Sequence, residues 1–205
     1  MDKKKLKRNT IISAIISFAI FAYNLTFSIL TTSNVMFVAS VSTLMVFICK
    51  ILFINNIFEK RTNKKKAYLG MAIACLSYTL IFILFVVLKV NGIDASNKKT
   101  YEGIYGAIFI SILVIMFILS IIGLKGALGK TDIMVTGLKE ITFISGLANL
   151  VVIEEFVSRI ILQYKEINLM KYVDSYFPLG ISIFMLIISI LMIVRFFRYK
   201  TTKEK

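Results

Sequence analysis

The chain has 205 residues, of which 58% are hydrophobic, and its formal net charge is +14. Soluble domains average about 45–50% apolar residues, so the composition excludes an ordinary soluble domain and predicts an all-α integral membrane protein. The sequence contains no histidine, which removes the commonest metal ligand and the commonest general base. We therefore expect neither a metal nor a cofactor, and an enzymatic function has weak support.

Six apolar windows are each long enough to cross a bilayer, which takes about 17–25 residues. They cover approximately residues 10–31, 35–55, 67–89, 103–124, 141–163 and 177–196. The connections between them are too short to hold a soluble domain. We predict a single transmembrane domain over 1–205, a polytopic bundle of six transmembrane helices. Pro178 is expected in the first turn of the last helix, where its missing N–H is harmless.

Basic residues concentrate in alternate connections. They precede the first window, separate the second from the third and the fourth from the fifth, and follow the last: Lys3, Lys4, Lys5, Lys7, Arg8, Lys60, Arg61, Lys64, Lys65, Lys66, Lys125, Lys130, Lys139, Arg195, Arg198, Lys200, Lys203 and Lys205. The positive-inside rule then predicts that both termini are cytoplasmic, in a multi-pass protein of the plasma membrane. The basic clusters should also attract anionic lipid headgroups. Because the charge is divided among loops, we expect no nucleic-acid partner.

Most tyrosines fall at the predicted ends of the windows, namely Tyr68, Tyr101, Tyr105, Tyr164, Tyr172, Tyr176 and Tyr199. A tyrosine ring suits that depth because it is apolar while its hydroxyl needs a polar partner. We therefore expect these seven hydroxyls at the membrane–water boundary.

Polar residues recur through the fifth window and its flanks. They are Asp132, Thr136, Lys139, Thr142, Ser145, Asn149, Glu155, Arg159, Gln163 and Glu166. Apart from one skipped turn at 152–153, the steps are three or four residues, which predicts one polar helical face. A charge at the centre of a membrane helix costs about 2.5–3.5 kcal/mol. Such a face should therefore be directed at other helices or at a water-filled cavity, away from lipid.

The segment IEEFVSRII, residues 153–161, holds the charges of this window. Glu155 and Arg159 stand four residues apart with the acid first, the favourable order for an ion pair along a helix. Glu154 is rotated by about 100° from Glu155 and has no cation on its own face, which favours its neutral form. We expect one carboxyl group to be paired and the other to exchange a proton.

These residues form the candidate substrate or ion site: Glu154, Glu155, Arg159 and Asn149, joined at similar depth by Asn24 of the first window and Tyr78 of the third. Hydroxyl residues at that depth are Ser42, Thr43, Thr79 and Ser111. Serine and threonine in membrane helices usually bond their own backbone or a neighbouring helix, which is the structural interpretation of these four.

The hexapeptide EEFVSR, residues 154–159, resembles the E-E-x-x-x-R motif of the intramembrane CAAX-processing and bacteriocin-processing proteases. The resemblance implies that Glu154 and Glu155 are catalytic carboxylates oriented by Arg159. That family also needs histidines on later helices, and this chain has none. We therefore interpret the match as coincidental, because single short motifs carry a high false-positive risk.

Two functions fit the sequence about equally. The first is a small carrier or proton- or ion-coupled permease with its polar site on the fifth helix. The second is a non-catalytic membrane subunit or scaffold whose charged face docks another membrane protein or a second copy. An intramembrane enzyme comes third. A carrier needs the polar face inside its own bundle, whereas a scaffold leaves that face exposed until its partner covers it.

The topology has a direct test in the loops. Ser96 lies in a loop predicted outside and Thr62 in a loop predicted inside. A membrane-impermeant thiol reagent added to intact cells should modify the Ser96→Cys variant. It should modify the Thr62→Cys variant only after the membrane is opened, and labelling of that variant in intact cells would overturn the topology.

Overall fold

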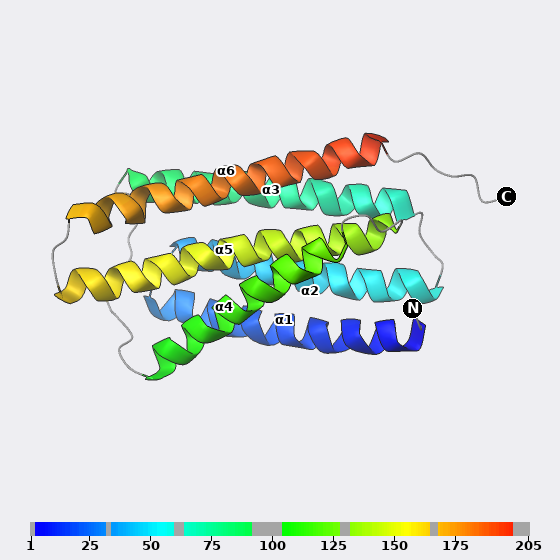
Figure 1. The fold of residues 1–205 in the computed structure, drawn as a ribbon, viewed down its shortest axis with the longest axis horizontal. Coiled ribbons are helices and arrows are strands. Elements are labelled where there is room, and N and C mark those ends of the chain that lie inside the picture. The colour runs from blue at the N-terminus through cyan, green and yellow to red at the C-terminus, as the bar shows by residue number, and fades with distance from the viewer. Residues whose placement is uncertain are drawn as a thin grey trace.

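The computed structural model is a bundle of six helices and describes residues 3–31, 34–59, 64–91, 104–127, 132–164 and 168–198 (Figure 1). The helices are α1 (Lys3–Thr31), α2 (Asn34–Glu59), α3 (Lys64–Val90), α4 (Ile104–Lys125), α5 (Ile133–Tyr164) and α6 (Asn168–Arg198). Each predicted window coincides with one of these helices, so the all-α prediction with six helices is confirmed.

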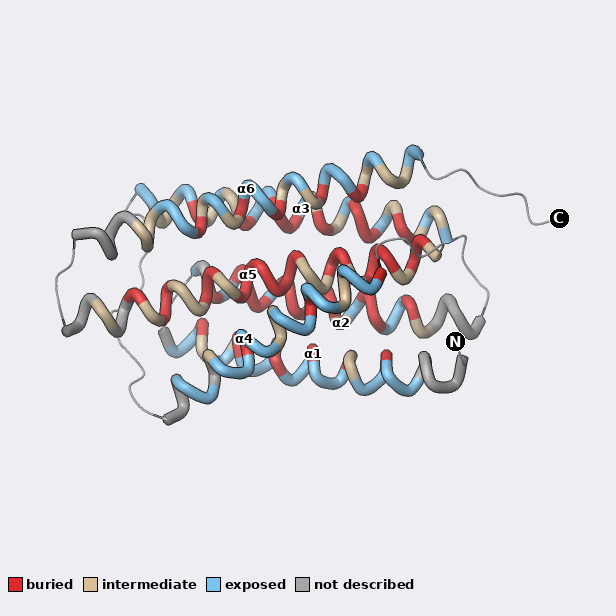
Figure 2. Tube along the Cα trace, in the orientation of Figure 1, coloured by how far each residue is buried: buried red, intermediate tan, exposed pale blue. Residues whose placement is uncertain are grey.

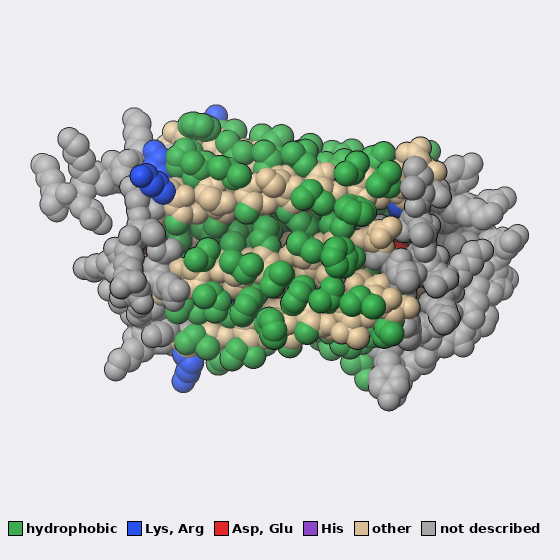
Figure 3. Space-filling view, turned by 180° about the vertical axis from the view of Figure 1, so that it is seen from behind, with side chains coloured by type: hydrophobic (Ala, Val, Ile, Leu, Met, Phe, Trp, Pro, Cys, Tyr) green, Lys and Arg blue, Asp and Glu red, His purple; other side chains and the backbone are tan. Residues whose placement is uncertain are grey.

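The helices run alternately up and down the long axis of the bundle (Figure 1). The starts of α1, α3 and α5 and the ends of α2 and α6 lie at one end. We call it the basic end, because it carries the described cations Arg8, Lys64, Lys65, Lys66, Arg195 and Arg198. Figure 3 shows lysine and arginine side chains gathered there, at its left edge, beside a mostly apolar surface.

Helix α5 occupies the centre of the bundle. It packs against α2, α3, α4 and α6, whereas α1 packs on α2, and α4 crosses α5 obliquely (Figure 1). In the apolar stretch of α5, 72% of the residues are buried, against 28–50% in α1, α2, α3 and α6 (Figure 2). The helix with the most polar residues is therefore the one best shielded from the surroundings.

The outer surface of the bundle is apolar over its middle (Figure 3). Large aliphatic side chains such as Ile15, Leu84 and Leu119 are more than half exposed. Soluble proteins rarely expose contiguous apolar patches beyond a few hundred Å². Five helices, α1, α2, α3, α5 and α6, are long and apolar enough to cross a membrane, and α4 has a shorter described apolar stretch, Ile110–Lys125. The molecule thus has the surface and the helices of a membrane protein.

Pro178 lies within α6 rather than in its first turn, so the prediction for this residue was wrong. The helix begins at Asn168, ten residues earlier. A proline inside a helix removes one backbone hydrogen bond. Membrane helices tolerate that loss because neighbouring groups and local adjustments satisfy the freed carbonyl.

Two glycines let α5 approach its neighbours closely. A Cβ at Gly137 would lie 2.7 Å from the ring of Tyr68 in α3, and one at Gly146 would lie 2.6 Å from Ser120 Oγ in α4. Small residues at such crossings bring helix backbones together, which is how membrane helices gain packing energy without a hydrophobic driving force.

Gly137→Ala should destabilise the protein, because the new methyl group would overlap the Tyr68 ring. Overpacking of this kind costs about 1–3 kcal/mol. Gly70→Ala is the matched control, because a Cβ there meets nothing within 4 Å; it should be neutral or stabilising by about 0.5–1 kcal/mol through helix propensity. Unfolding free energies in detergent micelles measure both, and equal values would contradict the close approach.

Candidate functional site

The polar residues of α5 divide between two sides of the helix. At about 100° per residue, Asn149 shares a side with Thr142 and Ser145, whereas Glu140 lies opposite. The six-residue step from Asn149 to Glu155 turns the helix by about 120°, which brings Glu155 to the side of Glu140. The predicted polar face therefore changes side at the skipped turn 152–153, where Glu155 lies about 120° from Asn149.

The first polar interface joins α5 to α1 and α2. Asn24 Nδ2 of α1 donates to Asn149 Oδ1 of α5 at 3.5 Å, and the Ser42 and Ser145 hydroxyls of α2 and α5 are 3.0 Å apart. Ser42 also donates to the Ala39 carbonyl at 2.6 Å, so Ser145 supplies the proton between the two hydroxyls. All four of these side chains are buried.

Lys50 is a buried cation at this interface. Only 4% of the residue is exposed, and its ammonium donates to Ser17 Oγ at 2.7 Å and to the Ser13 carbonyl at 3.1 Å. These bonds join α2 to α1 and replace part of the hydration that the ammonium loses on burial. Sequence reasoning missed Lys50, although a lone charge inside an apolar window is a signal of an internal polar contact.

A small cavity opens beside these contacts. It measures about 20 Å³, and its polar lining comprises Ser17, Thr43, Thr142, Ser145 and Asn149. A cavity needs about 10–15 Å³ and two to four polar partners to hold a water molecule. The first interface therefore has room for one water or one bare ion.

The second polar interface joins α5 to α3 and α6 at the basic end. Glu140 accepts a hydrogen bond from Tyr68 Oη of α3 at 3.0 Å and forms an ion pair with Arg195 of α6. The Glu140 side chain is 5% exposed, whereas that of Arg195 is 38% exposed. Tyr68 is fully buried, so its hydroxyl bonds a carboxylate in place of the water expected at the end of its window, while its depth in a membrane stays a prediction.

A hydroxyl pair lies farther along the same three-helix layer. Thr79 Oγ1 of α3 and Ser189 Oγ of α6 are 3.1 Å apart, and both residues are fully buried. Ser189 also donates to the Met185 carbonyl at 2.9 Å. This pair is interhelical, as the structural interpretation of the hydroxyl residues expected, and so is the Ser42–Ser145 pair.

The predicted carboxyl groups lie near the other end of α5. Glu155 is 1% exposed, and Ser158 Oγ donates to Glu154 Oε1 at 2.6 Å along the same helix. Glu155 is 15 residues beyond Glu140, about 22 Å along the axis and about 60° around it. The side chain of Arg159 lies outside the described part of the structure, so its pairing with Glu155 stays a prediction.

The structure unites some of the predicted site residues and separates others. Asn24 and Asn149 meet, and Tyr78 is buried with its hydroxyl next to Ser42, at the first interface. Glu154 and Glu155 lie on sides of α5 other than the side that carries Asn149. Ser111 is exposed and donates to its own helix, so it takes no part.

Sequence reasoning also missed the Tyr68–Glu140–Arg195 cluster. From the sequence, Arg195 is a topology signal and Tyr68 an interfacial aromatic residue. A signal was present, because Glu140 is an acid within a markedly basic part of the chain. An acid in that position has a cation as its natural partner, but only the packing of α5 against α6 selects which one.

No protein-family model, curated protein or solved structure matches this chain. What the site can do chemically follows from its carboxyl groups, cations and hydroxyls, and from their burial in the centre of an apolar bundle.

Arg195→Leu should lower the unfolding free energy, because the buried Glu140 loses its counter-charge. Breaking a fully buried pair costs about 3–5 kcal/mol; we expect about 2–3 kcal/mol, because Arg195 is partly exposed and water screens the pair. The double variant Glu140→Leu, Arg195→Leu should recover most of that loss. Arg198→Leu, an exposed cation one turn away, should change stability by less than about 0.5 kcal/mol. A double variant no more stable than Arg195→Leu would contradict the pairing.

Proposed function

We propose that this protein is a small multi-pass carrier of the plasma membrane that moves protons or a small ion, alone or coupled to a solute. The observation that carries the proposal is the position of Glu155, which is 1% exposed on the central helix of the bundle. Ionisable residues within membrane helices mark ion and proton pathways by default.

Six crossings with both termini in the cytoplasm form part of the proposal. Helix α4 has 22 residues, about 33 Å at 1.5 Å per residue, which matches a hydrocarbon core of about 30 Å. The start of α1, the end of α6 and most of the described cations lie at one end of the bundle (Figure 1), and the positive-inside rule assigns such an end to the cytoplasm.

Protons would enter and leave through the layer formed by α3, α5 and α6. Carboxyl groups lie near both ends, Glu140 at the basic end and Glu154 with Glu155 about 22 Å beyond. The Thr79–Ser189 hydroxyl pair lies in the same layer. Carboxyl and hydroxyl groups both accept and donate protons, and chains of acidic residues serve as proton relays in pumps and transporters.

The remaining predicted residues have supporting roles in this proposal. Arg159 would hold Glu155 in its charged form and leave Glu154 to exchange the proton. Asn24, Asn149 and Tyr78 would orient water or an ion at the first interface. The cavity there, about 20 Å³, favours a proton or a bare ion over an organic solute, because a drug-sized ligand needs about 300–1,000 Å³.

Burial also favours a carrier over a scaffold. A docking face would leave the polar residues of α5 open to the surroundings, but Ser145, Asn149 and Glu155 are at most 5% exposed within a single copy of the chain. Asn149 and Ser145 have their partners at the first interface, and these come from α1 and α2 of the same chain.

Proton flux into liposomes tests the proposal. Protein reconstituted around a trapped pH indicator should acidify the lumen when a membrane potential, negative inside, is imposed. Glu154→Gln should fold normally, because it mimics the neutral acid. It should lower the flux by about a hundredfold, within the range that a positioned proton-transfer group contributes.

Asp132→Asn is the matched control, because this carboxyl caps α5 at the basic end, where Asp132 Oδ1 accepts the Met134 N–H at 3.0 Å. Its flux should equal that of the unmodified protein. Flux from the unmodified protein no faster than from empty liposomes would refute the proposal, and so would undiminished flux from the Glu154→Gln, Glu155→Gln double variant.

A further inference from the structure

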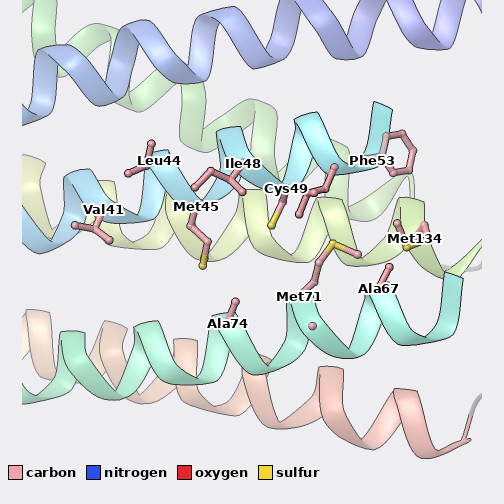
Figure 4. A pocket seen from close by; sticks show the side chains of 12 residues that line it. Val41, Leu44, Met45, Ile48, Cys49, Phe53, Ala67, Met71, Ala74 and Met134 are labelled. Carbon is pink, nitrogen blue, oxygen red and sulfur yellow. The ribbon is translucent and has the colours of Figure 1, made fainter. Parts of the chain in front are cut away.

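An apolar groove of about 500 Å³ runs between α2 and α3 (Figure 4). Val41, Met45 and Phe53 of α2 line one side, Ala67 and Gly70 of α3 line the other, and Met134 of α5 lies near the basic end. All the lining side chains are apolar, and several are methionines, whose flexible thioethers adapt to irregular ligands. A Cβ at Gly70 would meet nothing within 4 Å, so the groove has open space at that residue.

The dimensions of the groove fit one acyl chain. From Val41 to Phe53 the α2 helix rises about 18 Å, close to the thickness of about 15 Å of one leaflet of the hydrocarbon core. A transmembrane helix about 10 Å wide and 30 Å long has a volume on the order of 2,400 Å³. Such a helix would lie across the groove rather than fill it.

The groove opens toward a positively charged mouth. Phe53, Ala67 and Met134 lie toward the basic end in Figure 4, and α3 begins one turn before Ala67 with Lys64, Lys65 and Lys66. Lys64 pairs with Asp132 at 3.2 Å, and the Lys65 ammonium lies 5.1 Å from the centroid of the Phe196 ring.

Lys66 is exposed and forms no ion pair with a described residue. The described charges at this mouth are therefore three cations and one carboxylate. The first N–H groups of α3 add a partial positive charge.

We propose that this groove binds one anionic phospholipid of the cytoplasmic leaflet. One acyl chain lies along α2 and α3, and the phosphate group contacts Lys66 and the start of α3. Charge complementarity at the mouth distinguishes this lipid from a neutral one of the same chain length. This site is separate from the polar interfaces of α5; the leaflet rests on the proposed topology, whereas the binding itself does not depend on the carrier function.

Spin-labelled lipids test the proposal in the intact protein. The protein, in phosphatidylcholine nanodiscs, receives a trace of phosphatidylglycerol or phosphatidylcholine labelled on one acyl chain, and the immobilised fraction gives the relative affinity. Phosphatidylglycerol should bind more tightly than phosphatidylcholine. Lys66→Gln should reduce that preference about fivefold, the effect of one lysine near an anionic surface. Lys125→Gln, an exposed cation at the end of α4, is the control and should leave it unchanged.

Gly70→Leu should fill the groove and weaken binding of either lipid about tenfold. The leucine would displace about two methylene groups of the acyl chain, and losing their burial lowers the affinity by about that factor. Gly180→Leu is the matched control on α6, since a Cβ there also meets nothing within 4 Å and Gly180 does not line the groove. Ala74→Leu, a second groove-lining change, should repeat the Gly70→Leu result.

Two outcomes would overturn the proposal. One is equal immobilisation of both lipids by the unmodified protein. The other is a Gly70→Leu protein that keeps full lipid binding but changes its oligomeric state, which would identify the occupant of the groove as a helix of a second copy.

Discussion

Burial of polar groups on a central helix is the constraint on which the rest of this structure depends. In a hydrocarbon environment a charged or hydrogen-bonding group that faces lipid is costly, so it must find partners within the protein. Helix α5 carries Glu140, Ser145, Asn149 and Glu155, all at most 5% exposed. Helices α1, α2, α3 and α6 supply such partners, and the outward surface of the bundle can then be mostly apolar.

The two polar interfaces hold the bundle together differently. Toward α1 and α2, neutral amides and hydroxyls pair across helices, and such bonds contribute modestly, on average about 0.6 kcal/mol in one well-studied membrane protein. Toward α3 and α6, Glu140 meets a cation and a phenol, and charge-assisted bonds are about twice as strong as neutral ones. The Glu140 cluster therefore defines how α3, α5 and α6 assemble, and Gly137 lets the Tyr68 ring come close enough to take part.

The burial of α5 and its hydrogen-bonding neighbours also give the proposed transport a physical basis. A group that exchanges protons must be buried enough to be selective and still have hydrogen-bonding neighbours that relay the proton. Glu154 meets both conditions, since it is partly buried and accepts a bond from Ser158. The small cavity at the first interface limits what passes through this closed arrangement, so movement of a larger solute would require α5 to separate from a neighbour. Alternating access in transporters commonly works by rocking one group of helices against another.

The amino-acid sequence alone determined the number of helices, the apolar core of each and the membrane character of the chain. These follow from the lengths of apolar runs, which are local properties. The basic loops likewise predicted the end at which Lys64 and Arg195 lie. Even the importance of α5 was visible, because no other window carries as many polar residues.

Only the tertiary structure decided which polar residues meet. Tyr68 and Arg195 are distant from Glu140 along the chain, and nothing local to any of the three selects the others. The helical period of α5 predicted one polar face, but the turn skipped at 152–153 rotates Glu155 about 120° away from Asn149. Pro178 shows the same limit, because a proline restricts one turn while the packing of α6 against α3 and α5 decides how far the helix extends. Periodicity defines the faces of a helix, whereas the identity of the neighbour on each face depends on how all six helices pack at once.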